Sequence, residues 1–180
     1  MDSALGQGGR YPLYATFWRR EISYLILKLL HVTSVVIFLG NITTGLFWAN
    51  RAHKTRDFKL IALAFDGIIR SDRLFTGPGV AGILVTGFAG AIVAKYPILS
   101  TGWILWPIIL FSISGLVFGV WVAPLQRRIR DAAHAADSTG LTWEEYAKQY
   151  KKWEKWGLVA LITPVAAMVI MVLKPALPGI

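Results

Sequence analysis

Four long apolar stretches alternate with charged segments along the chain, at about residues 23–47, 75–94, 103–123 and 157–173. An α-helix of about 20 apolar residues crosses the hydrocarbon core of a bilayer, and each stretch is close to that length. Backbone polar groups in lipid must be satisfied within the helix itself. The pattern therefore predicts an all-α, integral membrane four-helix bundle over residues 22–180. The polar and aromatic segment 1–21 is expected to rest at the membrane interface.

The segment that links the first two stretches has an amphipathic pattern. Residues 51–73 carry six basic side chains among apolar residues at helical spacing. This pattern is typical of a helix on a membrane surface, so an interfacial helix is expected here. Asp66 and Asp72 interrupt the apolar face and are expected to be solvated or paired with Arg70 and Arg73.

Small residues recur on the second stretch, at Gly82, Thr86, Gly90 and Ala94, with Gly79 and Gly87 beside them. A helix face of this kind lets a second backbone, or a flat ligand, approach closely. The turn at 95–101 is short, which predicts that the second and third spans are antiparallel neighbours.

The third and fourth stretches carry signals for where their helices end and begin. The third helix is expected to continue into water to about Ala136 and then to break. Thr142 followed by Glu145 matches a capping box, which predicts the start of the last helix. Within that helix, Pro164 is expected to leave the carbonyl of Ala160 unpaired and to kink the helix.

Composition and charge agree with a membrane protein. Of 180 residues, 55% are hydrophobic and 16% charged, and the mean hydropathy is +0.53. The net charge of +9 comes mainly from two linking segments, since 51–73 holds six and 127–155 seven of the 19 Lys and Arg. Basic loops stay in the cytoplasm, which predicts a multi-pass protein of the bacterial inner membrane with both termini outside. Its expected partner is the lipid bilayer and not nucleic acid.

The chain has no cysteine. This excludes disulfides, iron–sulfur clusters and cysteine ligation of zinc or haem.

His31 is the candidate for chemistry within the membrane. Together with Ser34, Phe38, Asn41 and Gly45 it forms one stripe at helical spacing on the first span. An ionisable side chain in this position needs a partner inside the bundle. Three interpretations stay open: a hydrogen bond between helices, a cofactor or metal ligand, and a proton relay.

A haem b site is the most specific form of the ligand hypothesis. Met168 and the glycines Gly87 and Gly90 are expected at a depth similar to that of His31. A flat macrocycle needs an axial nitrogen or sulfur ligand and neighbouring helices without bulky side chains. Met168 or Met171 is a candidate second ligand; a five-coordinate haem, or His31 of a second protomer, is the alternative.

Other polar residues are expected to lie away from this site. His53 and His134 fall in the linking segments, which disfavours an isolated ion held by several histidines. Lys28 is expected to extend its ammonium group to the outer interface.

The runs LKLLHVTSVVIFLGNITTGLFW, SDRLFTGPGV, GWILWPIILFSISGLVF, VAPLQRR and MVLKP resemble the predicted integral membrane proteins of domain of unknown function 2269, over about 25–175. More distantly, the histidine, the Val-rich stretch and the glycine of the first span, with the closing Val-Leu-Lys-Pro, are similar to the bacterial four-helix protoporphyrinogen oxidase. The copper-resistance D membrane domain shares this plan. The distant resemblance implies haem b on His31 and electron transfer to the respiratory chain. Where the oxidase family has a lysine near the start of its third span, this chain has Trp103, Trp106 and Pro107.

Three functions remain as hypotheses, and no catalytic residue is identified. The first is a small redox protein that passes electrons between quinone or porphyrin-like donors and acceptors. The second is a non-catalytic accessory subunit, in a homo-oligomer or a larger membrane complex, with His31 only hydrogen-bonded. The third is a metal or small-solute transporter, disfavoured by the lack of an inverted repeat and of an acidic residue in the predicted spans.

Overall fold

The computed structural model describes residues 11–180, with side chains from Trp18 onward. These residues contain no strand, and the predicted all-α class is confirmed. The elements are α1 (Tyr11–Thr55), α2 (Phe58–Ser71), the π-helical segment η1 (Asp72–Thr76), α3 (Gly77–Ala94), α4 (Gly102–Val117), the π-helical segment η2 (Phe118–Val122), α5 (Ala123–His134), α6 (Ala136–Thr139) and α7 (Trp143–Leu173).

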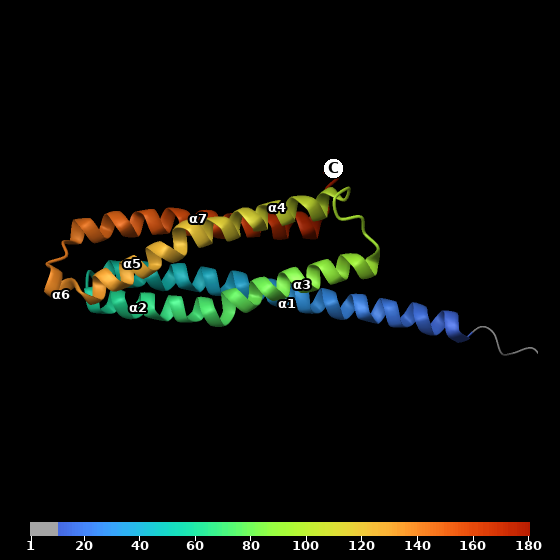
Figure 1. Ribbon diagram of the computed structural model, residues 1–180, viewed down its shortest axis with the longest axis horizontal. Coiled ribbons are helices and arrows are strands. Elements are labelled where there is room, and N and C mark those ends of the chain that lie inside the picture. The colour runs from blue at the N-terminus through green and yellow to red at the C-terminus, as the bar shows by residue number, and fades with distance from the viewer. Residues whose placement is uncertain (1–10) are drawn as a thin grey trace, which may run out of the picture.

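The described residues form four long continuous helices, here called rods (Figure 1). The π-helical segments join α2 to α3 and α4 to α5 without a break, so each of these pairs forms one rod. All four rods are long and apolar enough to cross a membrane, which confirms an integral membrane protein with four apolar helices. Residues 1–10 of the predicted N-terminal segment lie outside the described residues. From Tyr11 the chain is already helical, so the first helix is longer than the predicted span.

The rods are arranged as two pairs that separate at one end. α1 packs closely along α3, and α4 packs closely along α7. Figure 1 shows the two pairs apart at the end that holds the C-terminus and the loop 95–101, here called the terminal end. The second and third spans were expected to be neighbours. They run antiparallel, but each packs mainly on another helix.

At the opposite end, which carries α6, the rods form a closed core. Ile61, Phe65 and Ile68 of α2 are buried there with Ile129 of α5 and Trp153 of α7. Part of the apolar face predicted to lie on the membrane therefore packs on other helices, while Leu60 and Leu63 of the same helix stay exposed. The physical reason is that α5 has an apolar face of its own, and the two amphipathic helices bury these faces against each other.

The helix ends follow the local sequence signals. The third rod ends at His134, close to the predicted Ala136, and Gly140 adopts a left-handed conformation after α6. The predicted capping box is confirmed: Thr142 Oγ1 accepts from the backbone N–H of Glu145, and a Glu145 carboxylate oxygen accepts from the backbone N–H of Thr142. Both bonds use backbone donors that the first turn of α7 leaves without helical partners.

Pro164 lies inside α7 as expected, but the carbonyl of Ala160 has a partner. Ser114 Oγ of α4 donates a hydrogen bond to it at 2.6 Å, and both residues are buried. The sequence prediction of an unpaired carbonyl is therefore wrong. A carbonyl freed by proline is commonly satisfied by a serine of a neighbouring membrane helix, and here it joins α4 to α7.

We expect Ser114→Ala to lower the free energy of unfolding by about 1 kcal/mol, because the Ala160 carbonyl then loses its donor in a buried position. Ser112→Ala is the matched control, since Ser112 Oγ donates to the Ile108 carbonyl of its own helix and is exposed. Thermal unfolding in detergent measures both. Equal losses for the two variants would contradict the role given to Ser114.

Candidate functional site

A large cavity lies between the two helix pairs at the terminal end. Its volume is about 580 Å³, and α1, α3, α4, α7 and the loop 95–101 all contribute to its lining. Volumes of about 300–1,000 Å³ are typical of small-molecule and cofactor sites. The edge-to-face contact between Phe38 of α1 and Phe111 of α4, with ring centroids 5.4 Å apart, joins the two pairs across this lining.

The lining contains every cofactor-binding candidate that the sequence suggested: His31, Gly87, Gly90, Met168 and Met171. His31 comes from α1, the glycines from α3 and the methionines from α7. The shared depth of His31, Met168 and the two glycines was predicted by counting helical rise from the membrane boundary. That the two helix pairs separate beside them is a tertiary feature with no signal in the sequence.

The half-buried imidazole of His31 is held by α3. Its Nδ1 lies 3.0 Å from the carbonyl oxygen of Ile83 and 3.3 Å from Oγ1 of Thr86. The Thr86 hydroxyl donates its own proton to the carbonyl of Gly82, so it acts as an acceptor toward the ring. Since both neighbours of Nδ1 are acceptors, Nδ1 carries the proton and Nε2 keeps its lone pair. Nε2 has no hydrogen-bond partner among the described side chains.

The small residues of α3 divide into two groups. A Cβ atom at Gly79 or Gly82 would press on Phe38 or Ser34, so these glycines allow α3 to pack closely on α1. A Cβ atom at Gly90 would have nothing within 4 Å, and this glycine lines the cavity. The close approach of a second backbone, predicted from these small residues, is thus found between α3 and α1. Near Gly90 the same helix faces open space in the cavity.

Gly87 lies directly against the imidazole. A Cβ atom at this position would lie 3.0 Å from Cε1 and 3.2 Å from Nδ1 of His31. Gly87 therefore leaves the room that the ring occupies.

Two lysines complete the lining. Lys28 of α1 and Lys174, just after α7, both line the cavity. The Nζ atom of Lys174 lies 4.6 Å from the centroid of the Trp103 ring, a cation–π contact. An apolar cavity with cations in its lining suits an amphiphilic ligand that carries anionic groups. Sequence reasoning did not place Lys174 here, because its position depends on how the chain leaves α7.

The other two histidines lie elsewhere. His53 stacks on Tyr150, with ring centroids 4.0 Å apart, inside an aromatic cluster at the α6 end. His134 Nε2 lies 2.7 Å from a carboxylate oxygen of Asp66. Asp66 was expected to be solvated or paired with Arg70 or Arg73; its side chain is 43% exposed, and its ion-pair partners are His134 and Arg130 of α5. No group of three His, Asp or Glu side chains that could hold a metal ion occurs in the described residues.

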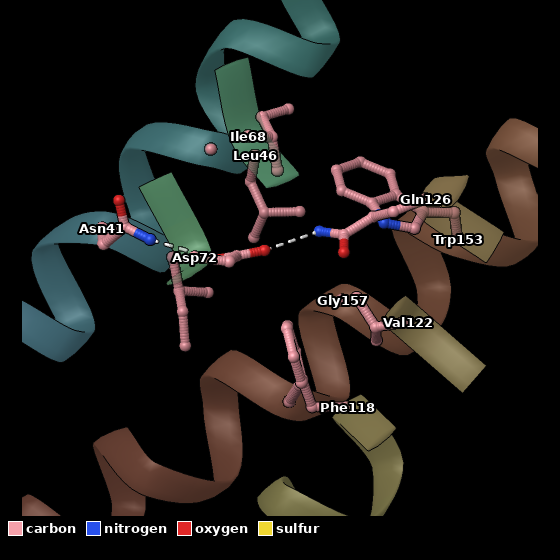
Figure 2. Close-up of a pocket in the computed structure, with 12 residues that line it drawn as sticks. Asn41, Leu46, Ile68, Asp72, Phe118, Val122, Gln126, Trp153 and Gly157 are labelled. Carbon is pink, nitrogen blue, oxygen red and sulfur yellow. Dashed lines mark hydrogen bonds between the residues drawn. The ribbon is translucent and has the colours of Figure 1, made fainter. Parts of the chain in front are cut away.

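Asp72 is also placed differently from the prediction. Figure 2 shows its carboxyl group between Asn41 and Gln126. Asn41 Nδ2 and Thr76 Oγ1 donate to Oδ1 at 3.0 and 2.9 Å, and Gln126 Nε2 donates to Oδ2 at 3.0 Å. The three donors come from α1, η1 and α5, so the half-buried carboxyl group of Asp72 is held by residues of neighbouring elements and is not paired with Arg70 or Arg73. Asp72 lies in the long helix Phe58–Ala94 that contains the second candidate membrane span, three residues before the predicted span 75–94 begins.

Comparison with known proteins gives the family. The profile described as predicted integral membrane protein (DUF2269) matches residues 25–175. The chain belongs to this family. No curated protein and no solved structure matches it. The predicted family resemblance is confirmed, and the more distant resemblance to haem-containing families stays a prediction.

Proposed function

We propose that this membrane protein binds haem b in the cavity at the terminal end, with Nε2 of His31 as an axial ligand, and acts in electron transfer. The observation that carries the proposal is the state of the imidazole. Nδ1–H is bonded to the Ile83 carbonyl, while Nε2 keeps a free lone pair in a residue that lines a 580 Å³ cavity. Histidines that ligate metals use the same arrangement, in which a backbone carbonyl fixes the tautomer and the ring orientation.

The rest of the lining fits such a group. Gly90 leaves open space on the α3 side, Gly87 leaves room for the His31 ring, and apolar residues of all four rods line the cavity. Lys28 and Lys174 supply cations for the two carboxylates of a porphyrin. Met168 and Met171 are candidates for a second axial ligand, and thioether ligation raises the reduction potential. A bound haem supplies a one-electron redox centre, and these residues hold, orient and shield it.

We place the protein in the bacterial inner membrane, with both termini outside and the α6 end in the cytoplasm. The support is the concentration of Lys and Arg at 51–73 and 127–155. In this orientation the cavity lies in the outer half of the bilayer. Its electron donors and acceptors would then be quinone or porphyrin-like molecules that reach the cavity from the membrane.

The test is an absorption spectrum of the protein purified in mild detergent, recorded reduced minus oxidised. A b-type Soret and α band supports haem binding. A colourless protein that takes up no added haem overturns it. If that colourless protein co-purifies in stoichiometric amount with a larger complex, the accessory-subunit hypothesis replaces the redox one.

Gly87→Ala is expected to weaken haem binding about 10-fold, the size of effect typical for residues that orient a metal ligand. The added methyl group would press on the imidazole and disturb its hydrogen bond to Ile83. Gly40→Ala is the matched control, because Gly40 lies outside the cavity lining and its added methyl group meets no atom within 4 Å. Titration of the purified apoprotein with haem, followed by absorbance, measures both affinities. A Gly87→Ala affinity equal to that of wild type would contradict the orienting role.

A further inference from the structure

A second, smaller pocket lies on the α6 side of the cavity described above and shares no residue with it. Its volume is about 20 Å³. Its polar lining residues are Asn41, Asp72, Gln126 and Trp153, and they come from α1, η1, α5 and α7. All four rods therefore meet at this pocket, which Figure 2 shows.

Both π-helical segments of the described chain also meet here. Asp72 is the first residue of η1, and Phe118 and Val122 are the two ends of η2. A π-helical turn replaces regular helical hydrogen bonds and is uncommon; such turns occur frequently at functional sites. Two π-helical segments on different rods face this one small pocket. Their presence marks the pocket as a specialised position in the bundle.

One polar atom in this lining has no partner. Trp153 is 2% exposed, and its indole Nε1 is the single buried side-chain nitrogen or oxygen in the described residues that makes no hydrogen bond. A buried donor without an acceptor is destabilising. Unused acceptors lie in the same lining: Asp72 Oδ2 accepts only from Gln126, and the Gln126 amide oxygen accepts no bond.

We infer that this pocket is a binding site for one water molecule, which accepts a hydrogen bond from Trp153 Nε1 and donates one to Asp72 Oδ2. A pocket of about 20 Å³ has room for a single water, which needs about 10–15 Å³ and two to four polar partners. The ligand must accept from an N–H group and donate to oxygen acceptors. Water does both, whereas a metal cation does neither and is repelled by the indole proton.

The water changes what Asp72 can do. The protein donors around the carboxyl group are two amides and a hydroxyl, and none of them is an acid or a base near neutral pH. A water molecule on Oδ2 gives the carboxyl group a neighbour with which it exchanges a proton inside the bundle. The site is thus a hydrated carboxyl group at the meeting point of the four rods.

Water-selective NMR of the full chain in detergent micelles tests this inference. The indole N–H signal of Trp153, assigned by its loss in Trp153→Phe, is expected to show a direct dipolar cross-peak to water. Because the side chain is shielded from bulk solvent, only an internal water produces it. Absence of the cross-peak overturns the inference. A Trp153 signal that shifts with NaCl but not with choline chloride also overturns it, by placing a cation in the pocket.

A pair of glycine variants locates the water. Gly157 lines the pocket, and a Cβ atom there would lie 3.1 Å from Leu46 Cδ2, so Gly157→Ala adds a methyl group to the lining. The cross-peak is expected to lose most of its intensity. Gly115→Ala is the control, since Gly115 lies outside the pocket with open space at its Cβ position. An unchanged cross-peak in Gly157→Ala contradicts a water at this position.

Discussion

His31→Ala is expected to abolish the b-type absorption of the purified protein. In the proposed haem site the substitution would remove the nitrogen ligand, and no other histidine lines the cavity. A porphyrin without its axial ligand keeps only the apolar contacts of the cavity and the lysine charges. Because a bond from His31 to the iron would fix the position of a bound haem, we expect complete loss of haem from this variant during purification in detergent. The measurement is the reduced-minus-oxidised spectrum, normalised to protein.

Two controls separate loss of a ligand from loss of the fold. His134→Ala is the matched variant, since His134 pairs with Asp66 at the α6 end and is exposed; its spectrum should equal that of wild type. Free imidazole should restore haem binding to His31→Ala by entering the space that the side chain leaves. A His31→Ala protein that stays helical and keeps its full b-type spectrum would show that the iron has another ligand.

Asp72→Ala is expected to lower the free energy of unfolding by about 3 kcal/mol, the largest stability effect among these variants. The carboxyl group accepts hydrogen bonds from Asn41, Thr76 and Gln126, and its removal leaves these donors without their acceptor inside the bundle. Each buried polar group left unpaired costs about 1–3 kcal/mol, and neighbouring losses are not additive. Equilibrium unfolding in mixed detergent micelles, followed by circular dichroism, gives the difference from wild type.

Asp66→Ala is the matched control for Asp72→Ala. Asp66 lies on the same rod, but its side chain is 43% exposed and its partners are His134 and Arg130 at the surface. An exposed ion pair contributes about 0–1 kcal/mol, so this variant should unfold almost like wild type. If Asp72→Ala is no less stable than Asp66→Ala, the hydrogen bonds around Asp72 do not hold the rods together.

The candidate site shows which features local sequence patterns can predict and which they cannot. The stripe through His31 and the glycines of the second span were readable from helical spacing, because spacing decides which residues share a face. Their neighbours in space were not readable. The acceptor for His31 Nδ1 is the carbonyl of Ile83, 52 residues away, and the donor for the Ala160 carbonyl is Ser114, 46 residues away. Such contacts form only when the helices have packed against one another in the final fold.

Asp72 illustrates the same limit on the second rod. Its apolar neighbours along the chain suggested an amphipathic helix on a membrane surface, with its acids in water. The π-helical segment η1 continues this helix into α3 and brings Asp72 to Asn41 and Gln126. Residues 31 and 54 positions away decide whether this carboxyl group is solvated.

By itself, the sequence determined the four membrane helices, the capping box at Thr142 and the presence of an imidazole on an inner stripe. These features depend on hydrophobicity, helical period and backbone capping, which act between residues close in the chain. The tertiary structure alone decided that α1 pairs with α3 and α4 with α7, and that the pairs separate around a cavity. Helix pairing depends on how side-chain shapes fit over whole faces, and many pairings satisfy the same apolar pattern.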